Sequence, residues 1–207
     1  MFSIIVILLC ILFSVCFAIT DLKILREKYA SQSVNSHSKE NTITVPWTYP
    51  LVKQCDERWG DDLMGNKTIC AVGCLMSSTS MGIAGAGISI EGSDSNPGSL
   101  NSWLKANGGY QNNNLIETVV PNIDPSRIFW PADAMHKTND LPYDTVAQFI
   151  RDGRIVIGNV MNGGHFVLLV GYSTDGDTLM VNDSGFNTES YSYSRDIVGY
   201  RIFDMKR

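Results

Sequence analysis

The chain has few of the groups that bind nucleic acids or metal ions. Its 207 residues include 16 Lys and Arg against 21 Asp and Glu, which gives a formal charge of -5, and no basic cluster alternates with aromatic residues. Lys and Arg are what hold a phosphate backbone, so we expect no nucleic-acid partner. There is no Cys-x-x-Cys motif and no two of the three histidines lie close together, so we expect no metal ion and no other cofactor.

The first 18 residues lack any charged side chain. They run from Met1 through a stretch of Ile, Val and Leu and end in Cys16-Phe17-Ala18, the small-x-small pattern that signal peptidase cleaves. The stretch is short for a bilayer span, and no later stretch suits one. We therefore expect a cleaved secretory signal at residues 1–18 and no membrane contact afterwards. The alternative is a retained signal anchor, which the lack of Lys or Arg before the apolar run favours.

Cysteine is scarce after the expected signal. Cleavage leaves Cys55, Cys70 and Cys74 in a compartment where disulfides form. An odd number of cysteines in a secreted protein indicates either an intermolecular bridge or a free, reactive thiol. The count alone does not say which cysteine has that role. The expected location is extracellular, or the lumen of a lysosome or endosome.

A polar extension precedes the apolar part of the chain. Residues 19–44 combine a short amphipathic stretch, Asp21 to Ala30, with a Ser-, Asn- and Lys-rich segment that cannot bury apolar surface. We interpret them as an arm and a linker, which is either loosely docked or a propeptide. Aromatic and apolar residues become dense from Val45, so residues 45–207 are expected to form one monomeric domain.

Helical and strand patterns occupy different halves of this domain. Helices are expected from Cys74 to Ala84, from Pro97 to the Asn107-Gly108-Gly109 turn and from Pro142 to Asp152. Strands are expected to begin at Ile155, His165, Thr178 and Gly199. Helices followed by an antiparallel sheet indicate the α+β class, with the functional site in a cleft between the two.

Cys74 has the position that thiol chemistry requires. A nucleophilic cysteine reacts as a thiolate, and a helix N-terminus with a nearby imidazole favours that form. Cys74 follows Gly73 and opens the first expected helix, where its backbone N–H could donate to an oxyanion. Without other signals, a lone cysteine at a helix start is more often a small buried residue.

One of the three histidines has a rigid position. His37 lies in the polar linker and His136 in a loop, whereas His165 begins the most apolar strand, which suits a general base. Asp183 ends the next expected strand, 18 residues later, so antiparallel pairing would bring it beside His165 to fix the tautomer of the ring. Asp183 could also be only a turn former. The order Cys, His, Asp, with helix before sheet, is the one that papain-type catalysis uses.

Three motifs occur in a characteristic order. They are VKQCDERWGDDLMGNKTICAVGCLMSSTSM from Val52, GRIVIGNVMNGGHFVLLVGY from Gly153 and LMVNDSG from Leu179. In this order they resemble the C-thirty-nine-like peptidases, papain-fold relatives of the double-glycine peptidases that process bacteriocin leaders. The resemblance spans Pro50 to about Phe203 and implies a papain-like cysteine peptidase fold, with N-terminal helices packed on a C-terminal antiparallel sheet. Nothing resembles the ATP-binding or membrane parts of a bacteriocin exporter, which makes cleavage after Gly-Gly doubtful.

The resemblance implies roles for four residues. Gln54, in the Gln-x-Asp-x-x-Trp motif, matches the residue whose side-chain amide contributes to the oxyanion hole. Cys74 matches the nucleophile, His165 the base and Asp183 the acid that orients it. Ser184 stands where the family usually has proline, which predicts a looser turn at this point.

The resemblance also bears on the odd cysteine. Cys55 and Cys70 lie where the family often has other residues, and both flank motifs that must converge in that fold. The favoured pairing is Cys55 with Cys70, which would close a loop of ~15 residues worth ~3 kcal/mol in the loop-entropy model and leave Cys74 free. A bridge from Cys70 to Cys74 remains the alternative, and it requires a sharp bend in the backbone.

Two tripeptides fit the sequon for N-glycosylation. Asn66-Lys67-Thr68 lies in an expected surface loop and is a candidate for a glycan. Asn182-Asp183-Ser184 is expected to stay unmodified, because a glycan there would obstruct the site.

These residues predict a secreted cysteine hydrolase that cleaves a peptide or amide bond in a peptide or protein substrate. One alternative is a catalytically silent papain-fold module that binds a peptide without cutting it. The other is an amidase or transferase that uses the same residues on a non-peptide amide. The intact set of Gln54, Cys74, His165 and Asp183 argues against the silent module.

Overall fold

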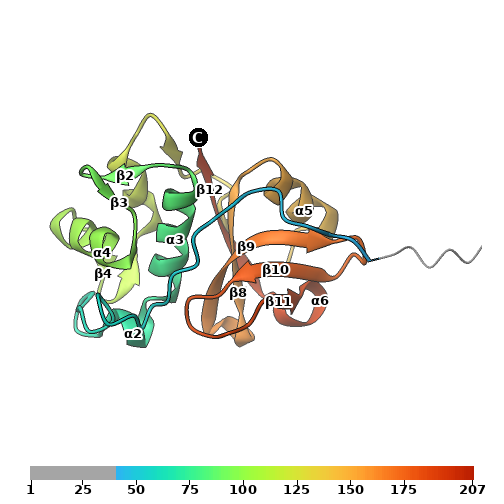
Figure 1. Ribbon diagram of the computed structural model, residues 1–207, viewed down its shortest axis with the longest axis horizontal. Helices are drawn as coiled ribbons and strands as arrows, with labels where there is room; N and C mark the ends of the chain where they lie inside the picture. Colours follow the sequence, from blue (N-terminus) through green and yellow to red (C-terminus); the bar gives the residue numbers. More distant parts are fainter. Residues whose placement is uncertain (1–40) are drawn as a thin grey trace, which may run out of the picture. The chain divides into compact units, whose positions relative to one another are not determined.

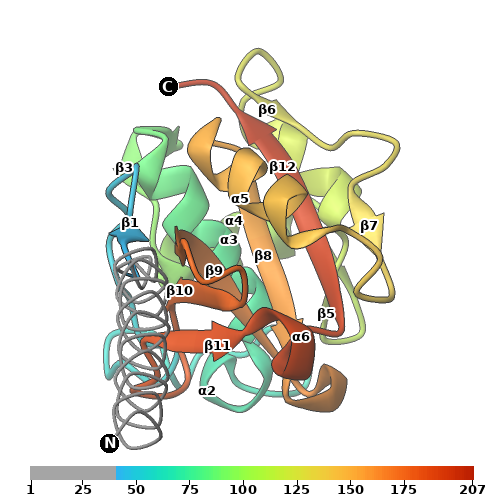
Figure 2. The same cartoon turned by 90° about the vertical axis from the view of Figure 1, so that its right-hand side faces the viewer.

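The computed structural model describes residues 41–207 (Figures 1 and 2), which combine α-helices with antiparallel strands. The expected signal at residues 1–18 and most of the expected arm and linker therefore lie outside the described residues, and so does His37. Within residues 41–207, no helix is long and apolar enough to cross a membrane.

The three helices expected from the sequence are present. They are α3 (Cys74–Gly85), α4 (Pro97–Ala106) and α5 (Tyr143–Arg151). The start of α4 shows why this segment becomes helical, since Asn96 accepts a hydrogen bond from the backbone of Ser99 and the Ser99 hydroxyl binds back to Asn96. Shorter helical segments were not expected; they are α2 (Ile69–Val72), α6 (Tyr193–Asp196) and the 3-10 turns η1 (Glu117–Ile123) and η2 (Met161–Gly163).

The main sheet is antiparallel and has the strand order β11-β10-β9-β8-β12-β6. The four expected strands form its centre; they are β8 (Ile155–Val160), β9 (His165–Ser173), β10 (Thr178–Asn182) and β12 (Gly199–Met205). Strands of two or three residues complete it; they are β11 (Ser190–Ser192), β6 (Ile128–Phe129), β7 (Met135–His136) and β1 (Ile43–Thr44). Because β1 pairs with β9, two residues of the expected linker belong to the sheet.

Two small hairpins lie outside the main sheet. They are formed by β2 (Ser89–Ile90) with β3 (Ser93–Asp94), and by β4 (Tyr110–Gln111) with β5 (Asn114–Leu115). Both occur in the half of the chain that also carries α3 and α4 (Figure 1). Strand pairs of this length carry no alternating pattern, which is why the sequence did not indicate them.

The central strands bury both of their faces. Alternate residues of β8 belong to different apolar clusters, since Ile155 and Ile157 join the cluster that contains α3 and α4, whereas Val156 joins the cluster that contains α5. Burial on both sides explains why β8 and β9 read as nearly continuous apolar runs. The outcome is a buried pair of strands, and the η2 turn and Gly164 that connect them lead into His165.

Helix α3 comes close to β8 and β9 because its residues are small. Residues 76–83 of this helix are buried, and the Ser78 hydroxyl donates to the backbone carbonyl of Phe166 in β9 at 3.3 Å. A methyl group added at Gly82 would lie 2.5 Å from Cγ2 of Ile155, which is itself fully buried. Gly82 therefore sets the distance between the helix and strand β8.

Replacing Gly82 by alanine is expected to destabilise the protein. Helix propensity alone would stabilise it by about 1 kcal/mol, but Cγ2 is a short branch of a strand residue that cannot swing away, and such overpacking costs about 1–3 kcal/mol. We expect a lower free energy of unfolding in urea for Gly82→Ala. Ala84→Gly, on a half-buried position of the same helix, reports the propensity term alone. A more stable Gly82→Ala protein would contradict the close approach.

Candidate active site

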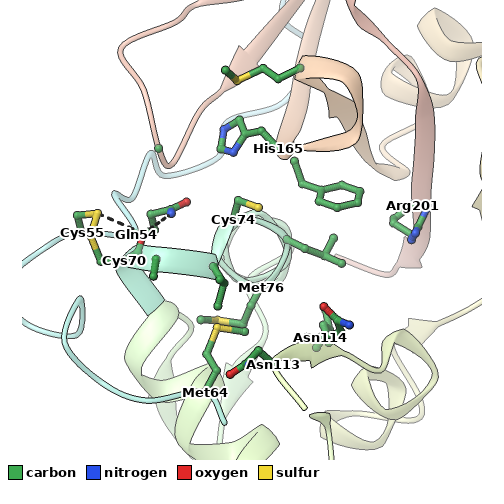
Figure 3. Close-up of a pocket in the computed structure, with 18 of the residues that line it drawn as sticks. Gln54, Cys55, Met64, Cys70, Cys74, Met76, Asn113, Asn114, His165 and Arg201 are labelled. Atoms are coloured by element: carbon green, nitrogen blue, oxygen red, sulfur yellow. Dashed lines mark hydrogen bonds between the residues drawn. A yellow bond between two sulfur atoms is a disulfide. The ribbon is translucent and has the colours of Figure 1, made fainter. Parts of the chain in front are cut away.

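A cleft of about 840 Å³ brings together residues that are distant in the sequence (Figure 3). Its walls come from the start of α3, the β4–β5 hairpin, the junction of η2 with β9, and the turn that follows β10. Gln54, Cys74 and His165 all line it. Asp183 lies behind His165 and does not line the cleft itself.

Cys74 is the first residue of α3 and a free thiol. Gly73 ends α2 and begins α3, with its N–H bonded to the carbonyl of Ile69 at 2.7 Å. A side chain at Gly73 would lie 2.5 Å from that carbonyl oxygen, so the tight junction requires glycine. The junction leaves the half-buried thiol at the N-terminal end of α3, on the cleft and beside His165 (Figure 3).

His165 and Asp183 form a buried pair. Nε2 of the ring lies 2.7 Å from Oδ1 of the carboxylate, and the residues are 5% and 1% exposed. The antiparallel register of β9 with β10, in which Asn182 faces Leu168, brings the two side chains together. The ring of Phe186 meets the imidazole edge-on, with 5.1 Å between centroids. Since Nε2 is held by Asp183, Nδ1 is the nitrogen left for the thiol.

Four hydrogen bonds surround the Asp183 carboxylate. Besides His165, the backbone N–H groups of Gly185 and Phe186 donate to Oδ1 at 2.9 Å, and the Tyr191 hydroxyl donates to Oδ2 at 3.0 Å. Burial alone would raise the pKa of Asp183, but these hydrogen bonds and the charge of His165 outweigh it and lower the pKa. Asp183 is therefore ionised over the neutral range.

The imidazole of His165 is held in its charged form. Burial would lower the pKa of His165, but its hydrogen bonds with Asp183 and Cys74, together with the negative charges of both groups, raise the pKa to about 9. At neutral pH the ring therefore carries a proton that it can give away.

The Gln54 side chain is fixed at both ends of its amide. Nε2 donates to the carbonyl of Cys70 at 2.7 Å, and Oε1 accepts from the Ser184 hydroxyl at 3.1 Å. The backbone N–H of Gln54 also donates to the carbonyl of Ser184 at 2.9 Å. The side chain is 8% exposed and lines the cleft, so its amide has one orientation there.

The expectation of a loose turn at Ser184 is wrong. Ser184 is 1% exposed, and its side chain and backbone both bind Gln54. Lys53 adds two hydrogen bonds from Nζ, to the carbonyls of Asp183 at 2.8 Å and Phe186 at 2.6 Å. These contacts replace the stiffness that a proline would supply, and they tie the 183–186 turn to the segment before α2.

The disulfide follows the favoured pairing. Cys55 is bonded to Cys70, and Cys74 remains free. The bridge joins the residue after Gln54 to the residue whose carbonyl accepts the Gln54 amide, and it lines one end of the cleft (Figure 3). It therefore holds Gln54 and its acceptor in one covalent unit.

A comparison with family models bears on this arrangement. The model described as the Peptidase_C39 like family matches residues 47–201, a range that includes every residue lining the cleft. The chain belongs to this family. No curated protein and no solved structure matches the chain in the corresponding searches. Membership of the C-thirty-nine-like family indicates a protein of the cysteine peptidase type, with a peptide as substrate.

Three other candidates from the sequence do not line the cleft of this C-thirty-nine-like site. His136 pairs with Asp140 at 2.8 Å and does not line the cleft. Asn66 is exposed, and its Oδ1 accepts a hydrogen bond from Asn113, which does line the cleft. In the second sequon, Nδ2 of Asn182 donates to the carbonyl of Tyr49 at 3.1 Å.

Sequence reasoning missed several groups around the cleft. Lys53 and Tyr191 reach Asp183 or its turn, and no motif in the sequence indicated them. Arg201 and Glu117 form an ion pair of 2.7 Å on the cleft wall, with the guanidinium 5.3 Å from the ring of Phe166. Their partners are set by strand register and by loops, for which a single sequence offers no periodic signal.

Replacing Cys74 or Asp183 is expected to lower the pKa of the His165 ring. Cys74→Ala removes a hydrogen bond and a negative charge, so the pKa falls below about 9. Asp183→Asn removes the carboxylate charge, which also lowers the pKa. A pH titration of the ring by NMR, with assignment through a His165→Gln sample, measures both shifts. A ring that titrates near 6.5 in the unaltered protein would contradict the described pairing.

Proposed function

We propose that this chain is a secreted cysteine hydrolase that cleaves a peptide or amide bond through Cys74, His165 and Asp183, on a papain-like fold. The observation that carries the proposal is the position of His165, which lies between a buried carboxylate at 2.7 Å and a free thiol on the same cleft. Family membership supports the same reading.

The reaction begins with the thiolate of Cys74 and the imidazolium of His165. The sulfur attacks the carbonyl carbon of the substrate, and the carbonyl oxygen becomes an oxyanion. His165 gives its Nδ1 proton to the leaving amine as the C–N bond breaks, which leaves a thioester on Cys74. The neutral ring then takes a proton from water, which attacks the thioester and releases the acid and the thiolate. Asp183 keeps the proton of Nε2 in place throughout, so that Nδ1 faces the reacting atoms.

Gln54 supplies one donor for the oxyanion. One N–H of its Nε2 binds the carbonyl of Cys70, and the other N–H has no partner among residues 41–207. The backbone N–H of Cys74, at the start of α3, is the second donor. Donors fixed before the reaction act where the negative charge develops and do not have to reorganise. The Ser184 and Cys70 contacts supply this fixation for Gln54.

The cleft suits an apolar segment of a peptide. Met161, Phe186 and Met135 belong to the large apolar side chains that are exposed in residues 41–207, and all three line the cleft. The ion pair of Glu117 with Arg201 adds a polar wall. A peptide could bury apolar side chains against this lining while its scissile carbonyl lies over Cys74.

Selective alkylation tests the proposed nucleophile. Iodoacetamide is expected to label Cys74 faster than a free thiol at the same pH, because a protonated imidazole beside a thiol favours the reactive thiolate. His165→Ala is expected to slow this labelling and to lower kcat/KM on a peptide library about 10²-fold or more. Labelling no faster than that of a free thiol, without peptide turnover, would favour a silent peptide-binding module. Turnover confined to non-peptide amides would favour the amidase or transferase reading.

Gln54→Ala tests the oxyanion donor separately. We expect kcat to fall about 10²- to 10³-fold, whereas alkylation of Cys74 stays nearly unchanged because the thiol and His165 are intact. Gln148→Ala removes an exposed glutamine of α5 that binds Asp152, and serves as the matched control with unchanged turnover. Equal losses of alkylation and turnover in Gln54→Ala would point to a structural role for Gln54.

We further propose that residues 1–18 are a signal peptide, that residues 19–44 form an arm and linker, and that residues 45–207 form the secreted domain. The disulfide is compatible with export into an oxidising compartment. Asn66 is exposed among the described residues, so its side chain is accessible for attachment of a glycan.

Secretion from a eukaryotic cell is expected to add one glycan, at Asn66. Treatment with a glycan-removing amidase should reduce the mass of the protein, and Asn66→Gln should abolish that difference. Asn66→Gln is preferable to a change at Thr68, because the Thr68 hydroxyl caps α2 and its loss costs about 1 kcal/mol. A glycan found at Asn182 would contradict the half-buried position of this side chain, whose Nδ2 donates to the carbonyl of Tyr49.

A further inference from the structure

The two oxygens of Asp183 have unequal sets of partners. Oδ1 accepts three hydrogen bonds, from His165, Gly185 and Phe186, whereas Oδ2 accepts one within residues 41–207, from the hydroxyl of Tyr191 at 3.0 Å. The carboxylate is 1% exposed, so water does not substitute for a missing donor. The Tyr191 hydroxyl is therefore the one hydrogen-bond donor to Oδ2 of this buried carboxylate within residues 41–207.

Strand β11 gives Tyr191 a defined position. Tyr191 faces Leu179 across the β10–β11 pair, and the backbone N–H of Val181 donates to the carbonyl of Glu189 at 2.9 Å. The ring packs half-buried against the apolar cluster that contains α5. Strand pairing therefore holds the backbone around Tyr191 and packing holds its ring, and together they direct the hydroxyl at Asp183.

The Tyr191 hydroxyl is protonated at neutral pH. Burial raises the pKa of Tyr191 to about 12, the charge of Asp183 adds to this effect, and a hydrogen bond with Thr188 opposes it. The phenol therefore keeps its proton at neutral pH and donates it to Oδ2 of Asp183.

We propose that Tyr191 is a positioning residue, whose hydroxyl keeps the Asp183 carboxylate turned so that Oδ1 stays on Nε2 of His165. This inference rests on the proposed function of the site. Tyr191 touches no reacting atom, and it acts through Asp183 alone. A series of side-chain contacts therefore extends from Tyr191 through Asp183 and His165 to Cys74, and each group fixes the orientation of the next.

Loss of the hydroxyl would leave Oδ2 without a donor in a buried place. The carboxylate could then rotate to use Oδ2 on another donor, or bind a proton at a higher pH than before. The ionisable groups that face this carboxylate are His165 from β9, Tyr191 from β11 and Lys53, whose Nζ binds the carbonyl of the same residue. Cys74 acts on it only through His165. Rotation and protonation of the carboxylate each weaken its hydrogen bond with the imidazole. Protonation also shifts the acid limb of the pH profile of kcat/KM.

The test compares Tyr191→Phe with Tyr193→Phe in the full secreted protein. Tyr193 lies two residues further on, and its hydroxyl donates to the carbonyl of Leu141 at 2.6 Å, away from the site. Tyr191→Phe is expected to lower kcat about 10-fold with little change in KM, and to move the acid limb of kcat/KM upward. Tyr193→Phe is expected to match the unaltered protein in both the pH profile and kcat.

A second measurement does not need turnover. NMR titration of the labelled Asp183 carboxyl carbon is expected to give a higher pKa in Tyr191→Phe than in the unaltered protein, and no change in Tyr193→Phe. Unaltered profiles and titration in Tyr191→Phe would overturn the proposal while leaving the enzyme intact. Absence of labelling and turnover in the unaltered protein would instead overturn the proposed function, and the titration would still decide whether Tyr191 holds Asp183.

Discussion

A buried negative charge at Asp183 is the constraint on which the site depends. A carboxylate out of water needs donors on both oxygens, because an unpaired buried charge costs several kcal/mol. Here the donors come from β9, from the turn after β10 and from β11. The register of these three strands places the donors around the carboxylate, so the orientation of the imidazole is a consequence of how the sheet is assembled.

The 183–186 turn joins this carboxylate to the other wall of the cleft. The backbone carbonyls of this turn accept hydrogen bonds from the Lys53 side chain and from the backbone N–H of Gln54. The Ser184 hydroxyl in turn donates a hydrogen bond to the side-chain amide oxygen of Gln54. A side chain at Gly185 would lie 2.9 Å from Cε1 of His165, so glycine is needed where the turn passes the ring. Asp183, which pairs with the imidazole, and Ser184, which binds the Gln54 amide, are thus neighbours in one turn, and a displacement of the turn would disturb both contacts.

Long elements with a sustained apolar pattern could be predicted from the sequence, and short ones could not. The helices that begin at Cys74 and Pro97 and the strands that begin at Ile155 and His165 are present because their apolar patterns extend over two or more turns or several residues. Strands of two or three residues, such as β1 and β11, depend on partners elsewhere in the chain. The expected signal and the domain limits stay predictions, because residues 1–40 lie outside the described part.

The candidate site divides in the same way. Cys74, His165 and Asp183 could be singled out because helix starts and strand ends are visible in the sequence, while Gln54 came only from the family resemblance. Ser184 was misjudged because the sequence shows the loss of a proline but not the partner that the hydroxyl finds. Tyr191 and Lys53 were missed because their contacts span 8 and 130 residues and follow from register and turn geometry.

The disulfide has a consequence for how protein with a free Cys74 thiol is produced. Three cysteines lie in residues 41–207, and one bridge among them can be formed in three ways, of which two consume Cys74. Thiol exchange during oxidative folding samples all of them until the chain around Gln54 and α2 is packed. The native bridge removes both competitors for the Cys74 sulfur among residues 41–207, so once folding is complete no other thiol in this part of the chain can pair with it. Oxidation of Cys55 and Cys70 to a disulfide therefore protects the Cys74 thiol from pairing with either of them.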